Sequence, residues 1–210
     1  MSSIQKSEFA RKAIHISNAI IPLSYFYLVQ DKINMIIILA FFVIFCFFVE
    51  NGRERNSTVS IFFSKWLDFM MRDNEKEGEL TGATWVFVGA LFTILLVPYP
   101  YSILALLFLS VGDSFAAIIG IKFPLIKVGE KTLSGSAAGF LACIIIGFIV
   151  DLSIRYEIVF FGAIMAMVIF DGGWLMGQMN RWWFHSFYIA TVYYFFKSMI
   201  IQHNCFRKNT

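Results

Sequence analysis

Long apolar runs, separated by short charged or turn-forming segments, are the feature that most constrains this chain. Inside a bilayer no water is available to the backbone amides of such runs, so only helices and closed barrels can cross it. The ten-residue alternation typical of barrel strands is absent. Hydrophobic residues make up 59% of the 210 positions, which is too apolar for an ordinary soluble domain. The sequence therefore predicts an all-α, polytopic membrane bundle.

The apolar runs define about seven candidate transmembrane helices. Very short connections, at 31–32 and around Pro98 and Pro100, predict tight antiparallel hairpins. No linker, repeat or low-complexity segment interrupts the chain, so we expect one integral membrane domain over residues 1–210. The expected spans are roughly 13–30, 33–49, 81–97, 101–121, 133–150, 157–177 and 182–202.

The distribution of basic residues predicts the orientation. If the N-terminus is cytoplasmic, twelve of the 17 Lys and Arg residues fall on the cytoplasmic side. This bias places the N-terminus, the 50–80 loop and the loop after residue 121 in the cytoplasm. The net charge of +3 is small, and we expect no nucleic-acid partner.

The 50–80 loop is the one sizeable extramembrane segment expected. Apolar residues recur in it at helical spacing, from Val59 to Met70, with Lys65, Asp68 and Arg72 on the other side. This pattern predicts an amphipathic helix, either in the headgroup plane or packed on the cytoplasmic end of the bundle.

Asp113 is the most informative single residue, because it lies inside the apolar run 101–121. A carboxylate in hydrocarbon costs several kcal/mol by insertion scales, so membrane helices that keep one usually use it. Its neighbours Gly112, Ala116, Ala117 and Gly120 are small and also fit a helix-packing seam. By helical spacing, Asp113, Ala117 and Gly120 share one face. We expect both roles on one helix.

A lysine-rich loop follows and ends in a hydroxyl- and glycine-rich segment, where the next span begins. Thr132, Ser134 or Ser136 can cap that helix and leave its free N–H groups to an anion, with Lys131 beside them and Gly135 within its first turn. Taken alone, the segment is better explained as an ordinary basic flank with a serine cap.

Further polar residues are expected on the cytoplasmic side. Arg11, His15 and Asn18 form a stripe at helical spacing, with Lys12 beside it. Glu79 precedes the third span, where acidic residues usually complement the helix dipole. Asp171 is a second carboxylate within a predicted span and a candidate metal ligand together with Asp113.

Four segments resemble the CTP-dependent lipid kinases, the family of phytol kinases, dolichol kinases and CTP-using diacylglycerol kinases. More distantly, they are similar to phosphatidate cytidylyltransferases. Ser134 stands where glutamate is frequent in the family, and Asp171 and Asn180 are the nearest candidates for its acidic motif near the last spans. The matching segments, in the family's order, are Glu8–His15, Glu79–Thr84, Val111–Gly120 and Lys131–Gly139.

The resemblance implies transfer of the terminal phosphoryl group of CTP to the hydroxyl of an isoprenoid alcohol or diacylglycerol, with Mg²⁺. It implies that Arg11 and Lys12 act in catalysis and that Asp113 and Gly120 belong to the nucleotide or metal site. We also expect Asp113 and Lys131 to act in catalysis, and the substrate or nucleotide to contact His15, Glu79, Gly112 and Ser114. The resemblance further implies that Lys131, Gly135 and Ser136 contact phosphate. Its partners would be a nucleoside triphosphate and a membrane lipid.

Two other functions remain as alternatives. Cytidylyl transfer, which forms a CDP-lipid, would use the same nucleotide, metal and membrane location. A small ion-coupled transporter would use Asp113 and Asp171 as ion or proton sites. The far half of the predicted bundle is almost purely apolar, which disfavours a transport pathway.

Overall fold

The computed structural model describes residues 12–55, 61, 80–128, 131–150, 152 and 154–171. These residues form an all-helical fold, with a two-residue antiparallel hairpin as its one β element in this part of the chain. The expected helical class is therefore confirmed. The span expected at 182–202, most of the 50–80 loop, Arg11 and Glu79 lie outside the described residues.

The first expected span is not a single regular helix. Residues 12–17 are helical, a turn follows, and the chain continues as α2 (Ile20–Ser24) and the π-helical η1 (Tyr25–Val29). Pro22 has no N–H to donate to the carbonyl of Asn18, which accepts from Ile21 instead at 3.1 Å. The missing helical hydrogen bond explains the break, which the sequence-based expectation of one span over 13–30 missed.

Two antiparallel helices follow this segment. Gln30 adopts a left-handed conformation (φ 52°), and the Asp31 carboxylate then accepts a 2.8 Å hydrogen bond from the Asn34 N–H at the start of α3 (Lys32–Arg55). Helix α6 (Gly82–Leu96) packs on α3, with the rings of Phe42 and Phe87 stacked at 5.1 Å. The tight reversal expected at 31–32 is confirmed.

The predicted fourth span is one continuous helical rod with a wider turn in its middle. It consists of α7 (Tyr101–Leu107), the π-helical η2 (Phe108–Gly112) and α8 (Asp113–Lys122). Its first half is the centre of the core, because Ile103 and Leu107 are fully buried. The hairpin of β1 (Lys127–Val128) and β2 (Lys131–Thr132) leads into α9 (Leu133–Ile149), and α10 (Tyr156–Asp171) packs on α9.

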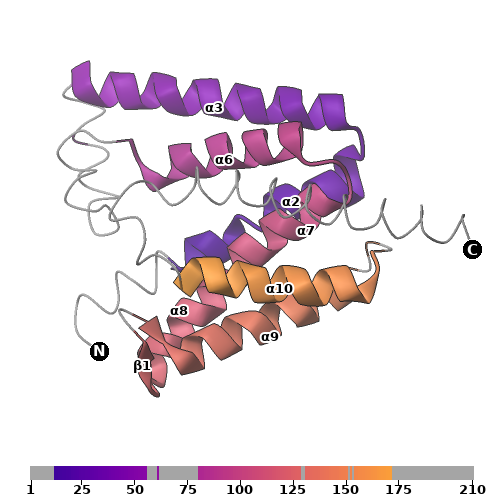
Figure 1. The fold of residues 1–210 in the computed structure, drawn as a ribbon. Helices are drawn as coiled ribbons and strands as arrows, with labels where there is room; N and C mark the ends of the chain where they lie inside the picture. Colours follow the sequence, from indigo (N-terminus) through magenta and orange to yellow (C-terminus); the bar gives the residue numbers. More distant parts are fainter. Residues whose placement is uncertain are drawn as a thin grey trace, which may run out of the picture.

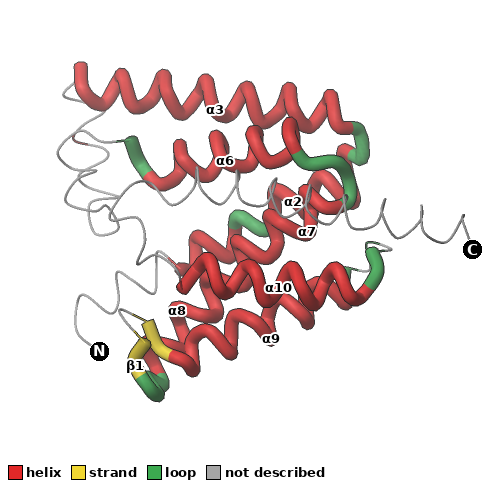
Figure 2. The backbone as a smooth tube through the Cα atoms, in the orientation of Figure 1, coloured by secondary structure: helices red, strands yellow, loops and turns green. Residues whose placement is uncertain are grey.

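Figure 1 shows that several helix ends gather at one end of the bundle, which we call the hairpin end. The end of α3, the start of α6, the end of α8, the start of α9 and the end of α10 all lie there. Figure 2 shows the strand pair and its adjoining loop at the same end, and the loops before α3, α7 and α10 at the other. Segments far apart in sequence thus share one end.

Two described helices are long and apolar enough to cross a membrane, Lys32–Arg53 and Tyr101–Lys122. Helix α6 has 15 residues and reaches about 22 Å, short of the ~30 Å hydrocarbon core. Helices α9 and α10 are also apolar but shorter than a full span. The seven-span count therefore stays a prediction.

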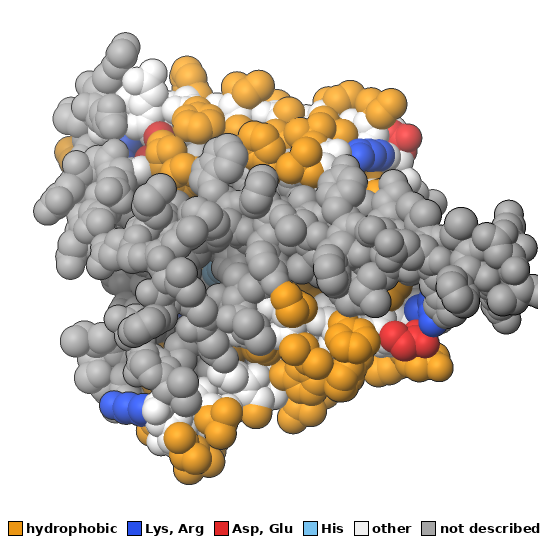
Figure 3. Space-filling model, in the orientation of Figure 1, with side chains coloured by type: hydrophobic (Ala, Val, Ile, Leu, Met, Phe, Trp, Pro, Cys, Tyr) orange, Lys and Arg blue, Asp and Glu red, His pale blue; other side chains and the backbone are white. Residues whose placement is uncertain are grey.

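The surface of the described residues has the pattern expected of lipid-facing helices. Along α3, Ile37, Phe41, Ile44 and Phe48 are exposed, which would leave a large apolar patch if water covered it. Figure 3 shows charged side chains near the ends of the visible described surface and hydrophobic side chains between them.

Candidate functional site

Lys12 and Asp113 form an ion pair across 101 residues of sequence. The distance from Lys12 Nζ to Asp113 Oδ2 is 2.5 Å, and the two side chains are 14% and 18% exposed. Such an enclosed pair gains more from its Coulomb attraction than a surface pair does, because solvent screens it less. Two residues that the sequence assigned to one cytoplasmic site are therefore in direct contact.

Ser114 joins the same two segments from within the protein. Its hydroxyl donates to the carbonyl of Ser110 at 2.7 Å and also lies 3.4 Å from the carbonyl oxygen of Lys12. The side chain is completely buried. Ser114 was expected among the substrate-binding residues, but its place is between two helices, where it fixes the first helical segment on α8.

The wide turn of η2 ends immediately before Asp113. The Ser110 hydroxyl donates to the carbonyl of Leu106 at 2.7 Å, within the region where the helix widens. Single π-helical turns inside α-helices occur frequently at functional sites, because the extra residue rotates the following side chains around the axis. No change in the apolar periodicity of residues 101–121 indicates this turn.

Glycines let α8 and α9 approach closely. A Cβ at Gly112 would lie 2.5 Å from Cys143 Sγ, and one at Gly135 would lie 2.6 Å from the carbonyl oxygen of Ala116. A Cβ at Gly120 would lie 2.8 Å from Thr132 Oγ1. Gly112, Gly120 and Gly135 were expected at the nucleotide or phosphate site, and this stays a prediction. In this structure they let the two helices pack closely, a role that the sequence also offered for Gly112 and Gly120.

The hydroxyl-rich start of α9 is held by its own hydrogen bonds. Thr132 is the N-cap, and its Oγ1 accepts from the Gly135 N–H at 3.3 Å. The Ser136 hydroxyl donates to the Thr132 carbonyl at 3.3 Å. Ser134 donates to the Phe123 carbonyl at 2.5 Å and accepts from the Leu125 N–H at 3.3 Å. The cap is confirmed, whereas Ser134 holds the preceding loop.

The other expected site residues are distributed around this centre. His15 is half-buried, one turn beyond Lys12 in the same helical segment. Lys131 begins β2, directly before the α9 cap, and Asp171 ends α10. The side chains of Lys131 and Asp171 are outside the described part of the structure.

A second polar cluster, which the sequence did not single out as a site, lies where α3 and α6 meet. The buried Glu50 carboxylate accepts from the Thr81 N–H at 2.8 Å and from the Thr84 hydroxyl at 3.2 Å. Its other oxygen lies 3.4 Å from Arg53 Nη2. Glu50 thereby caps α6 from a neighbouring helix. The available signal was a Glu and an Arg three residues apart at the end of an apolar run.

The donor set for a metal ion is incomplete within the described residues, where no group of three His, Cys, Asp or Glu side chains gathers. Asp113 supplies one carboxylate at the Lys12 contact. Mg²⁺ bound together with a nucleotide commonly uses one or two carboxylates plus phosphate oxygens and water.

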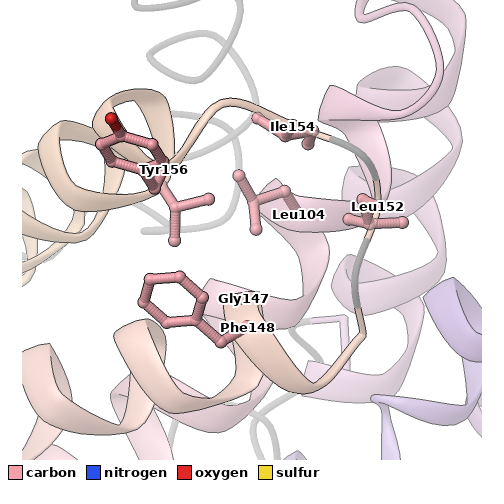
Figure 4. A pocket seen from close by; sticks show the side chains of 7 residues that line it. Leu104, Gly147, Phe148, Leu152, Ile154 and Tyr156 are labelled. Carbon is pink, nitrogen blue, oxygen red and sulfur yellow. The ribbon is translucent and has the colours of Figure 1, made fainter.

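A pocket of about 140 Å³ lies between α7, the end of α9 and the start of α10. Its lining residues include Leu104, Phe148, Leu152 and Ile154, as Figure 4 shows. The described lining residues include no carboxylate or cation, and the pocket lies where α9 ends, away from the hairpin end. It has no part in the polar site.

Comparison with known proteins adds little functional information. The chain is 27% identical over 152 residues to an uncharacterized protein of Rickettsia prowazekii (strain Madrid E), covering 71% of this chain and 74% of that protein. No family model matches the chain, and no solved structure matches it.

Proposed function

We propose that this protein is a membrane-embedded, CTP-dependent lipid kinase that phosphorylates a lipid hydroxyl. The observation that carries the proposal is the contact of Lys12 with Asp113. These residues come from two separate segments of the family-like pattern, Glu8–His15 and Val111–Gly120, and a third, Lys131–Gly139, packs on the same helix through α9. Motifs that lie together in the folded protein support a shared site better than motifs that only occur in the right order in the sequence.

The charges suit phosphoryl transfer, which depends on positioning and on neutralising negative charge more than on covalent chemistry. Asp113 would hold Mg²⁺ that enters with CTP, and the metal would supply charge neutralisation at the phosphates. Lys12 balances the Asp113 carboxylate and would exchange it for a phosphate oxygen when nucleotide binds. Arg11 and Lys131 would add further positive charge, as the family resemblance implies.

The acceptor hydroxyl must lose a proton during the transfer. His15 is the nearest candidate base in sequence to Lys12, one turn away on the same helical segment. An imidazole titrates close to neutral pH and can take a proton from an alcohol as it attacks. Lipid-facing apolar surfaces along the helices would let the acceptor approach from the bilayer.

The test uses purified protein in nanodiscs with Mg²⁺, a panel of isoprenoid alcohols and diacylglycerol, and CTP labelled at the α or γ phosphate. The proposal expects γ label in the lipid. Transfer of α label would identify a cytidylyltransferase instead, and failure of every lipid to acquire label would reject both activities.

Two variants sharpen the experiment. Asp113→Asn should abolish transfer, and Lys12→Met should lower kcat/KM by about 10²–10³-fold, by analogy with the loss of one oxyanion donor. Glu157→Gln is the matched control, because Glu157 is a carboxylate paired with a cation, Arg155, outside the site. It should keep full activity.

A further inference from the structure

The loop between α8 and β1, taken with its flanking residues as 122–127, presents apolar side chains outward. Phe123, Leu125 and Ile126 are 54%, 66% and 70% exposed. A single exposed apolar residue is ordinary on a protein surface. Three within four residues form a continuous apolar tip, which in water would be unfavourable. The exposure therefore points to a surrounding that is not bulk water.

This loop has a defined shape that keeps the tip exposed. Its backbone is hydrogen bonded to Ser134 at Phe123 and Leu125, and the Leu133 N–H donates to the Ile126 carbonyl at 3.0 Å. Ile126 has a φ of 35°, a strained conformation for a β-branched residue. Strain of this kind persists only where the surrounding structure imposes it and often marks a functional segment. The tip is thus held in place by the start of α9.

Positive charge flanks the apolar tip on both sides. Lys122 lies 5.5 Å from the ring centre of Phe123, Lys127 is exposed, and residues 122–128 contain no Asp or Glu. Apolar side chains beside lysines are the composition of segments that lie in the headgroup region of anionic membranes. A water-facing loop needs no such apolar tip.

The length of the preceding helix also places this loop in the headgroup region. The apolar helix Tyr101–Lys122 has 22 residues and reaches about 33 Å, close to the ~30 Å hydrocarbon core. The loop begins where this helix ends. Its apolar side chains therefore lie at the boundary between hydrocarbon and headgroups if the helix spans the bilayer.

We propose that residues 122–127 form an interfacial anchor, in which Leu125 and Ile126 enter the bilayer surface while Lys122 and Lys127 bind lipid phosphate groups. The anchor fixes the height of α8, and with it the Lys12–Asp113 pair, relative to the membrane. It depends on the membrane placement included in the proposed function but on no phosphoryl chemistry.

Spin-label accessibility in nanodiscs tests the anchor directly. Single cysteines replace Leu125 or Ile126 in full-length protein whose Cys46 and Cys205 are changed to alanine, with buried Cys143 retained. Collision with dissolved oxygen reports hydrocarbon, and collision with a nickel chelate reports water. The matched control is Lys127→Cys, one or two residues away.

The anchor predicts a several-fold higher oxygen-to-nickel ratio at positions 125 and 126 than at 127. Equally low ratios at all three positions would overturn it, because the tip would then be in water. Protection from both reagents would also overturn it, since another part of the protein or a second copy would then cover the tip.

Lipid charge tests the role of the lysines. In phosphatidylglycerol nanodiscs, the double variant Lys122→Gln/Lys127→Gln should bring the label at position 125 closer to water, and in phosphatidylcholine it should have no effect. The same response in both lipids would reject phosphate binding by these lysines. The measurements need no nucleotide, so a protein inactive with every lipid but with an inserted tip would reject the kinase and keep the anchor.

Discussion

Removing one partner of the Lys12–Asp113 pair should destabilise the protein more than removing both. With Asp113→Asn or Lys12→Met, the remaining charge stays in a site where its side chain is less than one-fifth exposed. Breaking a buried ion pair in this way costs about 3–5 kcal/mol of folding stability. Because both side chains keep some contact with solvent, we expect a loss at the lower limit, about 3 kcal/mol. The double variant removes both charges and should recover about 2 kcal/mol of that loss.

Thermal unfolding of the four proteins in one detergent measures the cycle. At about 2–4 °C per kcal/mol for a chain of this size, each single variant should lower Tm by roughly 6–12 °C. The double variant should unfold at a higher temperature than either single variant. The exposed pair Arg155 and Glu157 is the control cycle, and it should show little coupling.

Activity separates a catalytic pair from a structural one. If Asp113 and Lys12 act on the nucleotide, the double variant regains stability but stays inactive. Recovery of both properties in the double variant would show that the pair only joins two helices. Strict additivity of the two stability losses would refute the interaction itself, because groups in contact are coupled.

Three further substitutions test the packing around the site. Gly112→Ala should cost about 1–3 kcal/mol of stability in the same unfolding assay, because its Cβ would lie 2.5 Å from Cys143 Sγ. Adding Cys143→Ala should restore much of the loss. Gly52→Ala is the control and should be neutral or stabilising, since a Cβ there meets nothing within 4 Å. Glu50→Ala should lower stability by about 1–3 kcal/mol because the buried Thr84 hydroxyl and the Thr81 N–H lose their acceptor, and faster amide exchange at the start of α6 would check it. Thr132→Ala should cost about 1 kcal/mol through loss of the α9 cap, while Thr132→Ser should not.

The sequence predicted the helical class and several helix limits well, because these follow from hydropathy and turn residues. The expected span 101–121 corresponds to the rod of residues 101–122, and 133–150 corresponds to α9. It could not predict the π-helical turn of η2, since one extra residue in a turn leaves an apolar run unchanged. The break beside Pro22 was readable in principle from its missing N–H.

Helical spacing gives only part of the packing of α8. A spacing of four and seven residues places Asp113, Ala117 and Gly120 on one side of the helix. In the structure Gly112 and Gly120 also approach α9 closely, and Asp113 contacts Lys12. Spacing alone cannot rank two adjacent faces of a helix when both consist of small residues. Contacts with the neighbouring helix decide between them.

The packing seam and the polar site depend on each other through α8. Glycines bring α9 so close that Thr132 Oγ1 would meet a Cβ at Gly120, and the α9 cap is thereby fixed beside the end of α8. On another side of the same rod, Ser114 and Asp113 hold the helix that carries Lys12. A glycine substitution in the seam should therefore impair the site without touching a charged residue. For that reason, loss of activity in a glycine variant is no evidence of nucleotide contact unless its stability is measured as well.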